Sequence, residues 1–231
     1  RSIRKNIFII NKIAKQILQL LDYSSFCKIV HADLKPENVM IEALTFNPKV
    51  VDWGLAHFEN RCDYPTHSLF YRPLEKILKL EGSHTCLGDV WSLGCILYET
   101  YIGKALFAFR AGADLDPETF RGKLHLMEKK LGCEIPVEWI DKMQEGLRRD
   151  YFDKEEFCFG DVSPYSVKEP YLEHEAHAST SIDEDIMRSA IAKGDDLEKA
   201  KLLADLIKKM LKFDGRPSAR KLLETHPFFR Y

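Results

Sequence analysis

The sequence predicts a mainly α fold in which short β-hairpins lie close to the polar motifs. Apolar residues recur every three or four positions in residues 6–23, 89–101 and 203–211, which is the pattern of helices with a buried face. Val39–Ile41 and Lys49–Val51 are apolar runs too short for helices, and turn residues separate them. The 231 residues, 45% of them hydrophobic, can bury the core of one large domain or of two small ones.

The first expected helix, residues 6–23, has one apolar face. On that face lie Ile10, Ile13, Ile17 and Leu21. A short apolar run follows and leads into a polar stretch that reads HADLKPENVMIE from residue 31 to residue 42. The chain begins at Arg1 without an initiator Met and runs directly into this helical pattern, so we expect it to be an excerpt of a longer protein.

Two polar stretches carry the chemistry that the sequence offers. HADLKPEN at residues 31–38 and DWG at residues 52–54 contain four polar side chains, Asp33, Lys35, Asn38 and Asp52. A hairpin between the stretches would place them on neighbouring turns. Phosphoryl transfer to a hydroxyl needs such a set, because the acceptor must be held in line and cations must spread the charge on the moving group.

Each of the four side chains suits one role in that reaction. Asp33 would accept the hydroxyl proton, and Lys35 would neutralise the phosphate. Asn38 and Asp52 offer the hard oxygen ligands that Mg²⁺ prefers. The alternative interpretation is that these residues are caps and turns of ordinary loops. It fits each stretch alone, but it does not explain both stretches in this order and at this spacing.

These stretches resemble the catalytic loop H-R-D-L-x-x-x-N and the metal-binding turn D-F-G of the protein kinases. YRPLE at residues 71–75 is similar to Y-R-A-P-E of the CMGC group. LHLMEKKLG at residues 124–132 is similar to L-A-M-M-E-R-I-L-G of the LAMMER (Clk-type) dual-specificity kinases. The resemblance implies that residues 1–231 are the C-terminal lobe of a kinase domain, with a catalytic loop at 31–38 and an activation segment at 52–75.

The β-rich N-terminal lobe of that family is expected to be absent from this chain. The sequence shows no G-x-G-x-x-G loop after a strand and no V-A-I-K lysine, the elements that cover and fix the phosphates of ATP. Positioning supplies roughly 7–11 kcal/mol of barrier reduction in enzymes. We therefore expect this segment alone to have no useful kinase activity.

The resemblance also implies supporting roles around the catalytic loop. His31 would support the loop itself, and Ser68 stands where a Thr usually bridges the catalytic Asp and Lys. Glu75 and Arg216 would form a buried ion pair, although each alone is an ordinary surface charge. Asp89 would hydrogen-bond the backbone of the catalytic loop or simply cap the helix that it opens.

Three features depart from the family pattern or interrupt it. Ala32 replaces the Arg that reads a phosphorylated activation segment in many kinases, so we expect activity that does not depend on that readout. Trp53 replaces the Phe of D-F-G, at a position that packs an aromatic ring. Residues from about 153 to 185 are expected to form an exposed, partly disordered acidic insert, in which His174 and His177 are solvated rather than metal-bound.

The chain is expected to end in two helices. The first buries an apolar stripe that contains Leu203, Leu206, Ile207, Met210 and Leu211. Ser218 would cap the second, and HPFF at residues 226–229 resembles the ending of many kinase domains. The resemblance therefore covers essentially the whole chain.

Two functions from different classes remain open. The first is phosphorylation of protein Ser or Thr hydroxyls, and of Tyr in a dual-specificity manner, with ATP and Mg²⁺, by a larger kinase that contains this chain. The second is a non-catalytic pseudokinase or truncated kinase fragment that acts as a docking or regulatory module. The four intact polar side chains favour the first, and the missing nucleotide-binding lobe favours the second.

Composition limits the partners and the compartment. The net charge of -2 argues against strong binding to nucleic acid or anionic membranes, and no apolar run approaches the roughly 20 residues of a membrane span. The six cysteines include no C-x-x-C pair, so we expect free thiols in a reducing, nuclear or cytoplasmic compartment, and no structural zinc. We expect a monomer with protein substrates. The LAMMER resemblance implies Arg/Ser-rich splicing factors and a nuclear location.

Overall fold

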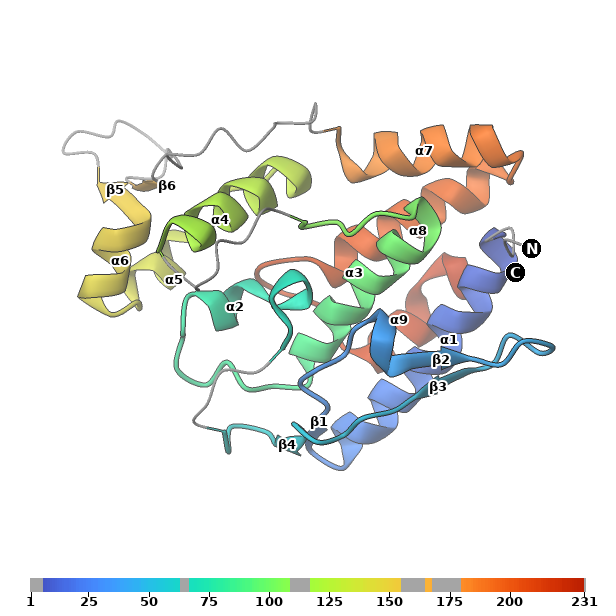
Figure 1. The fold of residues 1–231 in the computed structure, drawn as a ribbon, viewed down its shortest axis with the longest axis horizontal. Helices are drawn as coiled ribbons and strands as arrows, with labels where there is room; N and C mark the ends of the chain where they lie inside the picture. Colours follow the sequence, from blue (N-terminus) through green and yellow to red (C-terminus); the bar gives the residue numbers. More distant parts are fainter. Residues whose placement is uncertain (1–5, 63–66, 109–116, 155–164, 168–179, 231) are drawn as a thin grey trace.

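The computed structural model describes residues 6–62, 67–108, 117–154, 165–167 and 180–230, and it is mostly helical, as the sequence predicts (Figure 1). Its α-helices are α1 (Ile7–Phe26), α2 (Leu74–Ile77), α3 (Leu87–Ile102), α4 (Pro117–Leu131), α5 (Val137–Asp141), α6 (Glu145–Tyr151), α7 (Ile182–Lys193), α8 (Leu197–Met210) and α9 (Ala219–Thr225). Its 3-10 helices are η1 (Pro36–Asn38), η2 (Leu69–Tyr71) and η3 (Pro227–Phe229). The strands pair antiparallel, β1 (Ile29–Val30) with β4 (His57–Phe58), β2 (Val39–Ile41) with β3 (Pro48–Val50), and β5 (Phe152–Lys154) with β6 (Tyr165–Val167).

Helix α3 forms the centre of the helical body, and α1, α7 and α8 pack around it (Figure 1). Trp91 on α3 is fully buried between the rings of Phe107 and Phe213, whose centroids lie 5.7 and 6.1 Å from its own. The end of α8 comes very close at Gly94, where an added Cβ would lie 3.1 Å from side-chain atoms of Met210 and Leu211. The centre of the fold is therefore a close-packed, rigid platform.

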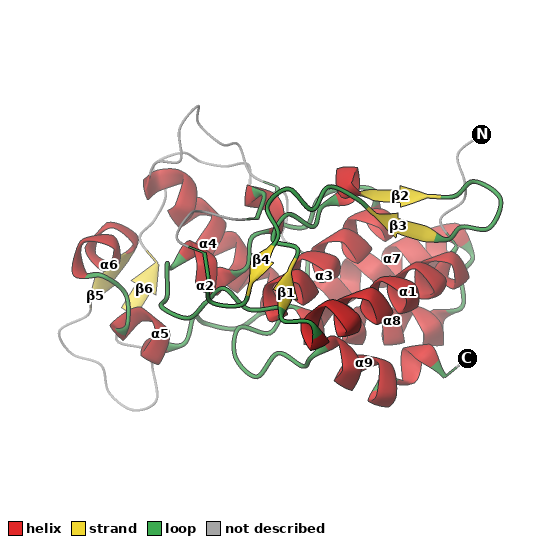
Figure 2. Cartoon of the chain, turned by 90° about the horizontal axis from the view of Figure 1, so that it is seen from below, coloured by secondary structure: helices red, strands yellow, loops and turns green. Residues whose placement is uncertain are grey.

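Helix α1 supports the predicted hairpin. The Asn6 side chain caps its N-terminus by accepting a hydrogen bond from the backbone N–H of Phe8 at 2.8 Å. The predicted apolar stripe is buried, and the helix continues past the predicted end at residue 23 to Phe26. Strand β3 packs on α1, and Figure 2 shows the β2–β3 hairpin along one side of the helical body with α9 on the other.

The β2–β3 hairpin brings the two polar stretches together. Val39 pairs with Val50 and Ile41 pairs with Pro48, so the second strand begins one residue before the predicted Lys49. At the open end of the hairpin, the N–H of Val51 donates to the carbonyl of Asn38 at 2.9 Å. The last residue of the first polar stretch and the first residues of the second therefore lie side by side.

The acidic insert expected at about 153–185 is shorter than predicted. Its first residues belong to β5, which pairs with β6, and its last residues begin α7. The residues between these elements, numbered 155–164 and 168–179, lie outside the described residues, and so do His174 and His177. The prediction was wrong at both ends because it treated every acidic residue there as solvated.

The first turn of α7 explains the error at the C-terminal end. Ser181 and Glu184 form a capping box, in which each side chain accepts a hydrogen bond from the other residue's backbone N–H. Asp185 accepts hydrogen bonds from the Tyr98 hydroxyl at 2.5 Å and from Lys130 at 2.7 Å. Acidic residues in a first helical turn are stabilised by the helix dipole, so here they mark a helix start and not a solvated loop.

Two negative observations concern the described residues only. Among the helices described, none is long and apolar enough to cross a membrane. The cysteines in the described ranges form no disulfide, and they are Cys27, Cys62, Cys86, Cys95 and Cys133.

A buried ion pair joins α2 to the segment after α8. Arg216 donates to the two carboxylate oxygens of Glu75 at 2.7 and 3.1 Å, and it also donates to the carbonyl of Leu87 at 3.0 Å. Its guanidinium carbon lies 4.9 Å from the ring centroid of Trp91. The side chains are only 3% and 12% exposed for Arg216 and Glu75, so the pair implied by the family resemblance is present and desolvated.

Arg216→Ala should lower the free energy of unfolding by roughly 3–5 kcal/mol, because it leaves the Glu75 carboxylate buried without its partner. Chemical denaturation measures this loss. Arg220→Ala is the matched control, since Arg220 pairs with Asp22 at the surface and should cost less than about 1 kcal/mol. Equal losses of unfolding free energy in the two variants would show that the buried pair stabilises the fold no more than the surface pair does.

Candidate active site

A single carboxylate on α3 holds the loop at residues 31–38. Asp89 accepts the backbone N–H of His31 at 2.7 Å and that of Ala32 at 3.0 Å, and it is 1% exposed. The N-cap position of α3 belongs to Cys86, so Asp89 is not the cap of its helix. These two bonds stabilise the loop with Ala32 in the left-handed region, at a φ of 66°.

Three polar side chains meet around the side chain of Asp33. Lys35 Nζ lies 2.7 Å from one carboxylate oxygen, and the Ser68 hydroxyl donates to the other at 2.7 Å. Lys35 also reaches the Ser68 hydroxyl oxygen at 3.2 Å. The Asn38 amide nitrogen donates to the carbonyl of Asp33 at 2.8 Å and lies 3.3 Å from its carboxylate. The structure therefore brings Asp33, Lys35, Asn38 and Ser68 into direct contact.

The charge state of Asp33 follows from these contacts. Burial raises its pKa, but the hydrogen bonds from Lys35 and Ser68 and the charge of Lys35 outweigh burial and hold the pKa below its ordinary value. The hydrogen bond to Asp33 in turn raises the pKa of Lys35. At neutral pH the carboxylate is ionised and the amine is charged, so Asp33 can accept a proton and Lys35 can bind an anion.

His31 links the two polar stretches. The N–H of Asp33 lies 3.2 Å from His31 Nδ1, so Nδ1 accepts and the ring proton sits on Nε2. Nε2 then donates to the carbonyl of Val51 at 3.1 Å. The ring of His31 also contacts the ring of Trp53, with centroids 4.6 Å apart. His31 thus fixes the position of the turn that carries Asp52.

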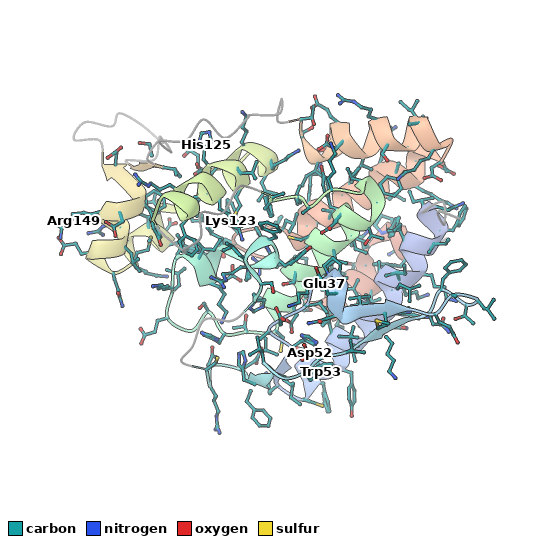
Figure 3. The ribbon with its side chains drawn as sticks, viewed as in Figure 1. Glu37, Asp52, Trp53, Lys123, His125 and Arg149 are labelled. Carbon is teal, nitrogen blue, oxygen red and sulfur yellow. The ribbon has the colours of Figure 1, made fainter. Side chains whose placement is uncertain are left out.

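Asp52 lies on the adjacent turn, and among the described residues it forms no hydrogen bond with Asp33, Lys35, Ser68 or Asn38. It has a φ of 59°, and its carboxylate accepts the N–H of Gly54 at 3.3 Å. Its charge contributes to the raised pKa of Lys35, and in Figure 3 it lies beside Trp53. Asp52 is exposed, and the amide oxygen of Asn38 accepts no hydrogen bond from the described residues. Hard oxygens on both residues therefore fit Mg²⁺.

Comparisons with known proteins agree with this geometry. The family model described as "Protein kinase domain" matches residues 3–229. The chain belongs to the protein kinase family. It is 32% identical over 243 residues to dual specificity protein kinase CLK1 from Homo sapiens, a match that covers 95% of this chain and 44% of that protein.

Other relatives are kinases of the DYRK type. The chain is 39% identical over 165 residues to the probable serine/threonine-protein kinase dyrk2 of Dictyostelium discoideum, covering 71% of this chain and 16% of that protein. It is 42% identical over 103 residues to the DYRK-family kinase pom1 of Schizosaccharomyces pombe. That match covers 44% of this chain and 9% of that protein. The resemblance to CMGC kinases of the Clk type is confirmed, and the chain spans less than half the length of these relatives.

One buried cation, Lys123, and the partly buried Arg72 make contacts in this kinase chain that the sequence did not predict. Lys123 on α4 is fully buried and donates to the carbonyls of Leu69 and, at 3.3 Å, of Arg72 (Figure 3). Burial lowers the pKa of Lys123 to about 7. Arg72 donates to the carbonyl of His67 at 2.8 and 3.1 Å. Lys123 stands in line with buried residues of α4, so a charge inside an apolar stripe was the available signal.

His67 connects the expected activation segment to the loop at residues 31–38. Its backbone N–H donates to the carbonyl of Ala32 at 2.6 Å, and its Nε2 lies 3.7 Å from Asp89. Burial lowers the pKa of His67, although the neighbouring carboxylate of Asp89 opposes that shift. The folded protein therefore resists protonating His67, whereas the unfolded chain does not.

This difference predicts a loss of stability at acid pH. Above about pH 6.5 His67 is neutral in both states and contributes nothing. Below that pH only the unfolded chain takes up the proton, so the free energy of unfolding falls by up to about 1.4 kcal/mol per pH unit until the lowered folded pKa is reached. Denaturation near pH 8 and pH 5 should show a smaller pH dependence in His67→Gln than in the unchanged protein. An identical dependence would contradict the assignment.

Proposed function

We propose that the protein containing this chain transfers the γ-phosphoryl group of ATP to Ser or Thr hydroxyls of other proteins, and to Tyr in a dual-specificity manner. The contact group of Asp33, Lys35, Ser68 and Asn38 carries this proposal. Catalysis of phosphoryl transfer depends on positioning and charge more than on covalent chemistry. A decayed site would not be expected to keep all of these contacts.

Each residue has a defined task in the proposed reaction. Asp33 orients the substrate hydroxyl and takes its proton on an ionised carboxylate oxygen. Lys35, which is 26% exposed at its side chain, faces the phosphate and binds it as a cation. Ser68 holds both groups in place through its hydroxyl. Asn38 and Asp52 would hold Mg²⁺, which supplies neutralisation of the phosphate charge when it is bound.

The nucleotide also needs groups that this sequence does not show. In kinases a Gly-rich loop covers the phosphates and a strand lysine contacts them. In the proposal, other residues of the whole protein supply these groups. The activity test therefore belongs on the whole protein and not on this chain alone.

The proposed subclass is LAMMER-like, with Arg/Ser-rich proteins such as splicing factors as substrates and the nucleus as the place of action. The similarity to CLK1, a dual specificity protein kinase by name, supports this subclass and the dual specificity. Exposed Glu37 adds negative charge beside Lys35, which would favour a basic peptide at the site.

Asp33→Asn in the whole protein should lower kcat by about 10²–10⁴-fold, because it removes the general base while keeping the shape of the side chain. The measurement is phosphorylation of an Arg/Ser-rich peptide with Mg·ATP. Asp22→Asn, a change at a partly exposed carboxylate on α1 that pairs with Arg220, serves as the control and should leave the rate unchanged. If the whole protein binds no Mg·ATP and phosphorylates no peptide, the docking or regulatory module becomes the better function.

The second test concerns Ala32. With no Arg before Asp33, no charge at this position can read a phosphorylated activation segment, so phosphatase treatment of the active whole protein should change its rate less than about twofold, within ordinary assay scatter. The control is a kinase with Arg at this position that is treated in parallel. A large drop in rate that maps to phosphates in residues 52–75 would reject the idea.

A further inference from the structure

Three potential metal ligands converge outside the catalytic group. They are His57 on β4, Cys62 in the turn after it and His84 in the loop before α3. One ligand atom from each residue lies within 4.8 Å of the ligand atoms of the other two. Cys62 is buried, and both histidines are partly buried. Cysteine spacing predicted no structural zinc, because it does not report ligands that come from separate parts of the chain.

Backbone contacts hold the three residues in this arrangement. His57 pairs with Val30 in the β1–β4 ladder. The N–H of Asn60 donates to the carbonyl of His84 at 2.8 Å, and the N–H of Cys86 donates to the Glu59 carboxylate at 3.0 Å. The rings of His57 and His84 lie 5.3 Å apart. These contacts hold β4 and the turn after it against the loop that carries His84.

The hydrogen bonding of His57 prepares it as a ligand. Its Nδ1 lies 3.1 Å from the carbonyl of Leu55, which can only accept, so Nδ1 carries the proton. Nε2 is then an unprotonated acceptor, and it is buried with no hydrogen-bond partner among the residues that the structure describes. Metal-binding histidines usually donate their second ring N–H in this way, and a buried acceptor without a partner is costly.

We propose that His57, Cys62 and His84 form a Zn²⁺ site, with water in the fourth position. Zinc binds imidazole nitrogen and thiolate sulfur at about 2.0–2.3 Å, which places ligand atoms roughly 3.3–3.6 Å apart in a tetrahedron. Ligand atoms within 4.8 Å of one another therefore need to approach by at most about 1.5 Å. On binding, the Cys62 thiol releases its proton to solvent and the thiolate forms the bond to zinc.

The position of the site gives it a structural consequence. Zinc would join the first half of the expected activation segment to the loop that leads into α3. The same helix carries Asp89, which holds His31 and Ala32. The metal would therefore fix part of the activation segment against the platform of the catalytic loop. Metal binding itself does not rest on the proposed kinase activity.

Cobalt absorption tests the site directly on the purified chain after treatment with a chelator. Stoichiometric Co²⁺ should give the strong visible bands of tetrahedral cobalt and a sulfur-to-cobalt charge-transfer band, and Zn²⁺ should displace both. Cys62→Ser should abolish the charge-transfer band, and His57→Gln should weaken binding by at least about tenfold. Cys133→Ser, which removes an exposed thiol elsewhere, should change neither.

Thermal unfolding gives a second readout that does not require a variant to fold well. Zinc at about 100 times its Kd should raise the Tm of the unchanged chain by roughly 5–10 °C. The proposal is overturned if stoichiometric Co²⁺ produces no sulfur-dependent band, if that band survives in Cys62→Ser, or if Cys133→Ser removes it. Absence of any zinc-dependent Tm shift would also overturn it.

Discussion

The arrangement of the site depends on one buried carboxylate. Asp89 accepts two successive backbone N–H groups at the start of the catalytic loop, and it does so from the central helix α3. Because α3 is packed on nearly all sides, its carboxylate cannot move without disturbing the core. Its two hydrogen bonds hold the loop rigidly as well, and this keeps Asp33 within hydrogen-bonding distance of Lys35 and Ser68. Positioning of this kind is the main contribution that a protein makes to phosphoryl transfer.

Buried charges hold the segment after the catalytic loop in the same way. Arg72 and Lys123 bind backbone carbonyls of the expected activation segment, and Arg216 binds Glu75 at its end. A buried cation is costly unless polar groups surround it, so each one favours a single local conformation. The burial that lowers the pKa of Lys123 to about 7 reflects this cost. Such contacts define the shape of the segment where a substrate would lie.

Much of the fold was predictable because it follows from local periodicity. The stripe of α1 and the two short runs of the β2–β3 hairpin gave elements within a few residues of their positions. The Glu75–Arg216 pair was accessible only through family motifs, since nothing local distinguishes either charge. Asp185 was misjudged because its partners Tyr98 and Lys130 are distant in sequence. Lys123 and the cluster around Cys62 also depend on tertiary contacts, which periodicity and ligand spacing do not report.

The absence of an Arg at position 32 does not leave the activation segment without a link to the catalytic loop. Ala32 has no charge to offer, but its carbonyl accepts the N–H of His67 while its own N–H is held by Asp89. This backbone hydrogen bond does not require phosphorylation, because it involves no charge that a phosphate could neutralise. This uncharged contact supports the proposal that activity does not depend on a phosphate read at position 32.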